Sequence, residues 1–115
     1  MPDRLITVAE TALFVRQAEG IWSGAEREEF VSYIAANPKA GDVIPETGGV
    51  RKVRWNTRGG GKRGGARVIY FYADLTRPLY LLMAYAKARK EDMSANEKRT
   101  VRNLVSVLKG RTQAR

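Results

Sequence analysis

The sequence predicts one α+β domain over residues 1–115, a small and mostly antiparallel sheet with flanking helices in the order β-α-β-β-β-α. Three observations carry this prediction. A chain of 115 residues is long enough for one hydrophobic core. Three strand-like segments follow one another through residues 50–87 with turn residues between them, which is typical of antiparallel pairing. Helical patterns begin at two serines, Ser23 and Ser94. We expect the helices to pack on one side of the sheet.

The first third of the chain is predicted to form a strand and then a helix. Residues 11–17 (TALFVRQ) are rich in β-branched and aromatic side chains, which indicates a strand. Ser23 and Glu26 have the spacing of a capping box, in which each side chain accepts a hydrogen bond from the other residue's backbone amide. The apolar stripe that follows stops before Pro38, so we expect a helix over 23–36.

The middle of the chain is predicted to form a hairpin and a third strand. Residues 50–57 (VRKVRWNT) and 66–75 (ARVIYFYADL) flank the glycine-rich connector 58–65 (RGGGKRGG), which is longer than the tightest hairpin loops. A turn at Thr76-Arg-Pro then leads into a strand at 79–87.

The last segment is predicted to be an amphipathic helix. Ser94 and Glu97 repeat the capping-box spacing, and Gly110 is a suitable end. The apolar positions have helical spacing; they are Val101, Leu104, Val105 and Leu108.

Positive charge is concentrated in the second part of the chain. Residues 1–46 carry four basic and eight acidic side chains, a balance of −4, whereas residues 47–115 carry seventeen basic and four acidic, a balance of +13. A surface with such an excess of cations favours a polyanionic partner, most often nucleic acid.

Two residue types are missing from the chain. The absence of cysteine removes disulfides and thiolate metal sites and fits a reducing, cytoplasmic location. We also expect no signal peptide or membrane span, since the N-terminus lacks a cationic start and the longest apolar stretch is short. The absence of histidine removes the commonest general acid or base, so any catalysis depends on lysine, arginine, tyrosine or carboxylates.

The glycine-rich connector formally contains G-x-G-x-x-G, but strands are predicted on both sides of it. The dinucleotide-binding form of this motif needs a following helix, whose N-terminus holds the phosphates, so we expect no nucleotide cofactor. The connector either drapes along a phosphate backbone or is a simple loop. Its cationic residues are Arg58, Lys62 and Arg63.

Alternation along the first hairpin strand separates its basic residues into two sets. Arg51, Val53 and Trp55 share one face, and Lys52 and Arg54 share the other. An exposed polar face would account for Lys52 and Arg54 without any function. However, neither has an acidic neighbour in the sequence, and an unneutralised pair of cations favours a bound anion.

The other two strands supply further candidates. Arg67 opens the second hairpin strand among apolar residues, where it either pairs with a carboxylate or grips a phosphate in bidentate fashion. On the third strand, Tyr85 and Lys87 are predicted to share a face with Met83 and Leu81. Core packing is the ordinary role of such a tyrosine, but the nearby lysine favours a wet, functional strand end.

The succession of these segments resembles the HigB branch of the RelE/ParE superfamily of bacterial type II toxins. The motifs that carry the resemblance are VRKVRW, GGARVIYFY and LYLLMAYAKARKEDMSANEKRTVRNLV, and the likeness covers nearly the whole chain. The resemblance implies a compact sheet flanked by helices. It also implies a ribosome-dependent endoribonuclease that cuts mRNA without metal or cofactor, by attack of a 2′-hydroxyl on the adjacent phosphate.

The resemblance also implies the site residues. The catalytic set would be Lys52, Arg54, Arg67, Tyr85 and Lys87, and Arg51 and Lys90 would bind RNA. The cationic residues of the connector, Arg58, Lys62 and Arg63, complete the predicted RNA-binding set. Convergent cations would stabilise the dianionic phosphorane, and the ribosome would position the substrate. A cognate antitoxin with an acidic or partly disordered segment is the expected protein partner, and mRNA with the 70S ribosome is the expected target.

Two other functions remain compatible with the sequence. A ParE-like member of the same fold would poison DNA gyrase and would not be a nuclease. A plain RNA-binding or ribosome-binding protein would bind RNA tightly without cleaving it.

Overall fold

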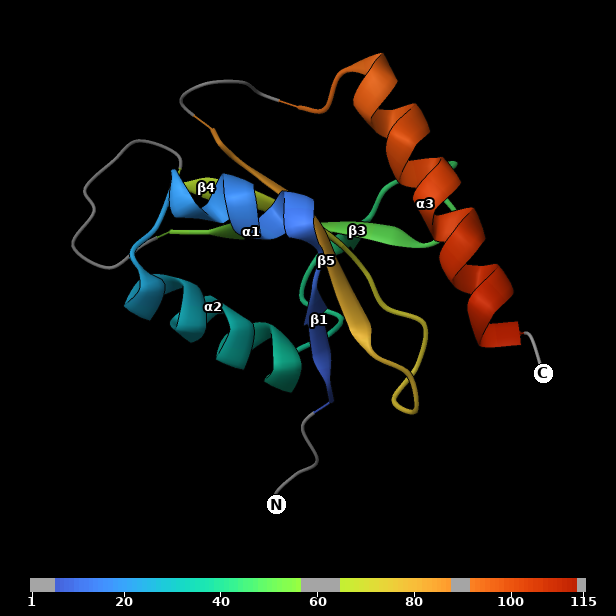
Figure 1. The fold of residues 1–115 in the computed structure, drawn as a ribbon, viewed down its shortest axis with the longest axis horizontal. Helices are drawn as coiled ribbons and strands as arrows, with labels where there is room; N and C mark the ends of the chain where they lie inside the picture. Colours follow the sequence, from blue (N-terminus) through green and yellow to red (C-terminus); the bar gives the residue numbers. More distant parts are fainter. Residues whose placement is uncertain (1–5, 57–64, 88–91, 114–115) are drawn as a thin grey trace.

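The computed structural model describes residues 6–56, 65–87 and 92–113, which form five strands and three helices (Figure 1). In chain order the elements are β1 (Val8–Glu10), α1 (Ala12–Glu19), α2 (Gly24–Ala36), β2 (Asp42–Val43), β3 (Val50–Trp55), β4 (Ala66–Phe71), β5 (Leu79–Ala86) and α3 (Ala95–Gln113).

The five strands form one sheet in the order β1-β5-β4-β3-β2. The β2–β3, β3–β4 and β4–β5 pairs are antiparallel, and only β1 runs parallel to its neighbour β5. The predicted α+β class and the mostly antiparallel sheet are therefore confirmed. All six residues of β4, the central strand, are buried.

The helices cover both faces of the sheet, and the expectation that they pack on one side is wrong. Side chains of α1 and α2, including Phe14 and Phe30, form a core with Val68 of β4. Side chains of α3, including Val105, form a second core with the next residue of β4, Ile69. Because successive strand residues point to opposite faces, the two cores lie on opposite sides of the sheet.

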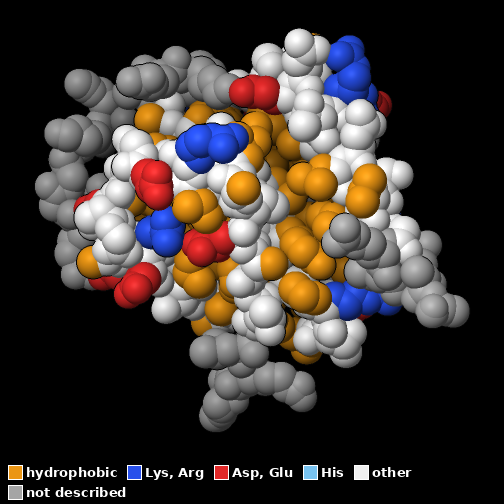
Figure 2. Space-filling view, viewed as in Figure 1, with side chains coloured by type: hydrophobic (Ala, Val, Ile, Leu, Met, Phe, Trp, Pro, Cys, Tyr) orange, Lys and Arg blue, Asp and Glu red, His pale blue; other side chains and the backbone are white. Residues whose placement is uncertain are grey.

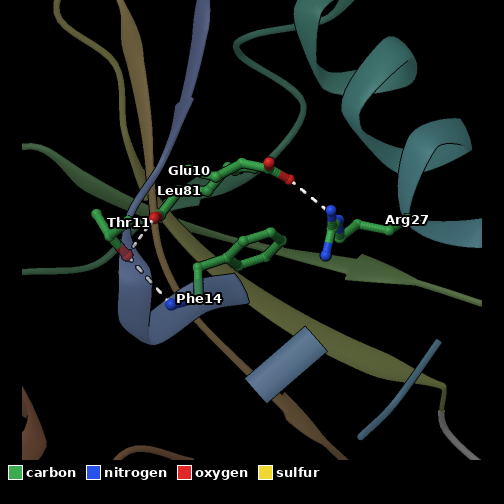
Figure 3. Close-up of polar contacts among 5 residues, drawn as sticks. All are labelled: Glu10, Thr11, Phe14, Arg27 and Leu81. Carbon is green, nitrogen blue, oxygen red and sulfur yellow. Dashed lines mark hydrogen bonds and ion pairs between the residues drawn. The ribbon is translucent and has the colours of Figure 1, made fainter. Parts of the chain in front are cut away.

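The predicted strand over residues 11–17 is also wrong, since β1 ends before it and most of it lies in α1. The Thr11 hydroxyl accepts a hydrogen bond from the backbone N–H of Phe14 at 3.2 Å and donates one to the carbonyl of Leu81 at 2.9 Å (Figure 3). Thr11 is therefore an N-cap that also ties the helix to β5. The buried residues of α1, Phe14 and Ala18, are four positions apart, which is the spacing of one helix face.

The start of α2 follows the sequence prediction. The Ser23 backbone amide donates to Glu26 Oε1 at 2.9 Å, and the Glu26 amide donates to Ser23 Oγ at 3.1 Å, so the capping box is confirmed. The helix is joined to β1 by an ion pair between Arg27 and Glu10, whose nitrogen and oxygen lie 3.3 Å apart (Figure 3).

The second capping box, at the start of α3, is confirmed as well. The Ser94 amide donates to Glu97 Oε1 at 2.8 Å, and the Glu97 amide donates to Ser94 Oγ at 3.1 Å. The helix continues past the predicted end at Gly110 as far as Gln113.

A register shift in the β4–β5 pair changes which residues of β5 share a face. Ile69 pairs with Met83, but the next residue, Tyr70, pairs with Leu81. Leu81 therefore packs in the core beneath α1 and α2, whereas Met83 packs beneath α3 with Tyr85. The prediction that Leu81 shares the face of Met83 and Tyr85 is wrong, because strict alternation does not hold across a β-bulge.

The core under α3 is only partly covered. Leu13, Tyr80 and Leu104 pack against it and are themselves half-buried. Figure 2 shows hydrophobic side chains gathered between α1 and α3 on this side of the molecule. Within the described ranges, none of the helices has the length and apolar character needed to cross a membrane.

Candidate active site

Side chains from three neighbouring strands form one row across the sheet. Arg54 of β3 pairs with Arg67 of β4, and Arg67 pairs with Tyr85 of β5. Directly paired residues on antiparallel strands project to the same face, with Cβ atoms about 4.5–5.5 Å apart. We call Arg54, Arg67 and Tyr85 the cationic row. It brings two guanidinium groups and a phenol together from segments that are up to 31 residues apart.

Lys52 lies on the same face as the cationic row, one pair of residues along β3. It is paired with Ile69, which is paired with Met83. Two residues of a strand span about 7 Å. A single phosphodiester group is therefore within reach of both Lys52 and the row.

Arg67 occupies an unusual place for a charged residue. It belongs to the central strand, is only 9% exposed, and is the one buried charged residue in the described part of the chain. Its Nη1 donates a long hydrogen bond of 3.5 Å to the carbonyl of Ala66. A guanidinium stays protonated in proteins, so the neighbouring strands hold a fixed positive charge at the centre of the row.

Tyr85, at the other end of the row, is buried and remains a neutral phenol at physiological pH. The pKa of its hydroxyl is raised to about 12, mainly by burial and also by the nearby Asp92 carboxylate, while the Arg67 guanidinium acts in the opposite direction. A neutral phenol can donate a hydrogen bond or a proton.

Lys52 does have an acidic partner, which corrects the expectation drawn from its sequence neighbours. Its Nζ lies 3.5 Å from Asp92 Oδ1, and the two side chains are 33% and 51% exposed. The pKa of Asp92 is lowered, first because the Met93 backbone amide donates to it at 2.7 Å, and also because the ammonium groups of Lys52 and Lys98 are near. The carboxylate is therefore ionised at neutral pH.

Sequence reasoning missed Asp92 because it lies 40 residues beyond its partner. One sequence signal could have identified it. Asp92 stands two residues before Ser94, the N-cap of α3, and α3 packs on the face that carries Lys52. The packing of α3 on this face places the residues before the helix, including Asp92, next to Lys52.

The remaining predicted site residues divide into three groups. Lys87 follows β5 directly, and its backbone amide donates to the Gly65 carbonyl at 3.0 Å, beside the row. Arg51 lies on the opposite face, where its Nη1 donates to the Gly41 carbonyl at 2.7 Å, so it is not brought together with the others. A third group lies outside the described residues and consists of Arg58, Lys62, Arg63 and Lys90.

Replacing Tyr85 by phenylalanine is expected to change the alkaline stability of the fold. The pKa of Tyr85 is raised from near 10 to about 12, so the stability gained by keeping the phenol neutral is present below pH 10 and lost as the pH rises through 12. The free energy of unfolding of the unmodified protein should fall by about 1–3 kcal/mol more than that of Tyr85→Phe over this interval. Denaturant titrations at several pH values measure this difference. Parallel curves for the two proteins would contradict it.

Comparison with known proteins identifies a family. The model of the family described as "RelE toxin of RelE / RelB toxin-antitoxin system" matches residues 32–115, which include β2 to β5, α3 and every residue of the cationic row. The fold is similar to a solved structure of E. coli toxin RelE, a double arginine-to-alanine mutant in the free state. The TM-score is 0.53 at 11% sequence identity, and the match covers 76% of this chain and 90% of that chain.

Proposed function

Because this chain belongs to the RelE toxin family of toxin–antitoxin systems, we propose that it inhibits growth by cleaving mRNA on the ribosome, as a member of the HigB branch. The observation that supports the proposal best is the cationic row. Arg54, Arg67 and Tyr85 lie side by side on one sheet face, with Lys52 one pair away. The net charge of +13 over residues 47–115 would attract the RNA backbone to the surface around the row.

The row is suited to stabilising charge on a phosphate. In the proposed reaction the 2′-oxygen forms a bond to phosphorus and the bond from phosphorus to the 5′-oxygen breaks. Negative charge grows on the non-bridging oxygens between these events. Arg67 donates from a fixed position, while the exposed Arg54 and the half-buried Lys52 approach from β3. Losing one such preorganised donor costs roughly 10²–10³ in rate.

We assign Tyr85 and Lys87 to the leaving group. The hydroxyl of Tyr85 is buried in the free protein, so this neutral phenol would give its proton to the departing 5′-oxygen only after the bound substrate has opened the site; without that proton the oxygen leaves as an alkoxide. Lys87, at the end of the same strand, adds a positive charge near that oxygen. No histidine is available for this step anywhere in the chain.

The ribosome and the antitoxin complete the proposed function. A site of a few cations on an open sheet face does not by itself align the 2′-oxygen for in-line attack, and a ribosome-bound message supplies that alignment. The RelE family implies a cognate antitoxin. An acidic segment of the antitoxin would bind the strongly basic part of the toxin quickly, because opposite charges steer the encounter.

The HigB assignment rests on sequence features. These are the basic strand VRKVRW, the GGARVIYFY segment and the succession of Tyr85-Ala-Lys, an acidic-polar turn and a capped helix. The capping box at Ser94 that forms part of this succession is present in the fold.

Inducing the protein in bacteria and mapping mRNA 5′ ends tests this function. We expect growth to stop within a few generations and new 5′ ends to accumulate inside translated reading frames. Blocking translation initiation on a reporter message should remove the cuts from that message. Growth arrest with intact messages and inhibited gyrase supercoiling would support a ParE-like poison instead. Continued growth with tight RNA binding would support a non-catalytic RNA-binding protein.

A further inference from the structure

The proposed reaction needs a group that accepts the proton of the attacking 2′-hydroxyl, and the groups on this face are few. The chain has no histidine. The guanidinium groups of Arg54 and Arg67 offer only hydrogen-bond donors. Tyr85 is a neutral phenol and so is a donor. Lysines in ordinary surroundings are ammonium ions near pH 7. Among the residues that the structure describes, carboxylates are the remaining acceptors close to the row.

In the described part of the chain, the carboxylates of Asp92 and Glu97 both raise the pKa of Tyr85, but they differ in the contacts that they already make. Glu97 Oε1 accepts the Ser94 backbone N–H at 2.8 Å as part of the α3 capping box. Asp92 lies between β5 and α3, and its side chain is 51% exposed, so a substrate can reach it. Its position is set by the hydrogen bond from the backbone of Met93, whose own side chain is buried in the core under α3.

We propose that Asp92 is the general base, which takes the proton from the 2′-hydroxyl as that oxygen attacks phosphorus. The assignment rests on the proposed ribonuclease function and adds a catalytic residue to it. Asp92 lies beside Lys52, with 3.5 Å between Oδ1 and Nζ, and close enough to Tyr85 for its charge to act on the phenol. Asp92 is therefore near both the phosphate-binding group Lys52 and the proton donor Tyr85.

The proton balance of this reaction is complete. The 2′-hydroxyl proton moves to the Asp92 carboxylate, the bond from the 2′-oxygen to phosphorus forms, and the bond to the 5′-oxygen breaks. The 5′-oxygen takes the Tyr85 proton, leaving a 2′,3′-cyclic phosphate and a 5′-hydroxyl. Asp92 then loses its proton to water and Tyr85 regains one.

The ion pair couples the two halves of this reaction. While Asp92 is ionised, it neutralises Lys52. When Asp92 accepts the proton, its charge disappears and the ammonium of Lys52 is released toward the phosphate. This happens as negative charge grows on the phosphorane, so Lys52 would stabilise the transition state more than the bound substrate.

Single-turnover cleavage of ribosome-bound mRNA by purified Asp92→Asn and Asp92→Glu proteins tests the assignment. Removal of a general base lowers the rate of the chemical step by roughly 10²–10⁴-fold, and we expect this loss for Asp92→Asn, while Asp92→Glu keeps a large part of the activity. Asp74→Asn is the matched control. Asp74 is also a half-exposed carboxylate with a lowered pKa, 3.5 Å from an arginine, but it lies in the β4–β5 turn. Its replacement should leave the rate unchanged.

The pH dependence separates a base from a residue that only positions Lys52. Among the described residues, the charged groups that act on Asp92 are Lys52 from β3 and Lys98 from α3, and Asp92 in turn acts on Tyr85 of β5, as Glu97 of α3 also does. All of them remain in Asp92→Asn. Hydroxide then replaces the missing base, so the rate of this variant should rise about tenfold per pH unit near neutrality, whereas the unmodified protein should show a nearly flat profile.

Each outcome of these measurements bears on a separate claim. Asp92→Asn cleaving as fast as the unmodified protein would overturn the base assignment, and so would a slow variant with a flat profile. Absence of cleavage by the unmodified protein on programmed ribosomes would instead overturn the proposed function. Loss of one half-exposed ion pair has little effect on stability, so thermal unfolding should show that both Asp92 variants are folded.

Discussion

Replacing Arg67 by alanine is expected to abolish growth inhibition and to lower mRNA cleavage by roughly 10²–10³-fold. Arg67 is the buried centre of the cationic row, between Arg54 and Tyr85. We expect no neighbouring side chain to take the place of its guanidinium. The measurement is the growth of cells after induction, together with single-turnover cleavage by the purified protein.

Three control variants test whether the loss of activity is due to the charge of Arg67 and to its position in the row. Arg67→Met keeps the volume of the side chain and should be as inactive as Arg67→Ala. Arg67→Lys keeps the charge but not the planar donor geometry, so it should recover only part of the activity. Arg51→Ala removes an arginine of the same sheet that faces the other side, toward the Gly41 carbonyl, and should remain toxic. Full toxicity of Arg67→Met would disprove the role of the row.

Replacing Phe30 by alanine is expected to lower the free energy of unfolding by about 3–5 kcal/mol. Phe30 is fully buried in α2, and its ring stacks on Trp22, with centroids 5.6 Å apart, and meets Trp55 of β3 edge-on at 5.5 Å. The cavity would lie between the helix and the sheet. A loss of this size is a large part of the 5–15 kcal/mol that stabilises an ordinary domain.

Tryptophan fluorescence measures this change directly, because the chain has two tryptophans and both contact Phe30. Guanidinium titration should show a lower midpoint for Phe30→Ala and an intermediate one for Phe30→Leu. Leu75→Ala, at a position that is 56% exposed, should change the stability by less than about 0.5 kcal/mol. Equal stability of Phe30→Ala and Leu75→Ala would contradict the packing of α2 on this face.

Local sequence signals predicted much of the fold correctly. Both capping boxes depend on residues three apart, and both are formed. The alternation that separated Arg51 from Lys52 and Arg54 holds because β3 is regular. The same reasoning gave the wrong face for Leu81, where a bulge interrupts the alternation. It also gave a strand for residues 11–17, where a threonine N-cap and a contact with β5 favour a helix.

The sequence alone determined which chemistry is available to this protein. It has a basic second half, no histidine, and basic strand residues whose alternation indicates which of them share a face. Only the tertiary structure decided which groups meet. The β3–β4–β5 register placed Arg54, Arg67 and Tyr85 in one row, and the packing of α3 brought Asp92 to Lys52. The physical reason is range: alternation and capping act within a few residues, whereas pairing across 40 residues depends on how the whole sheet and its helices pack.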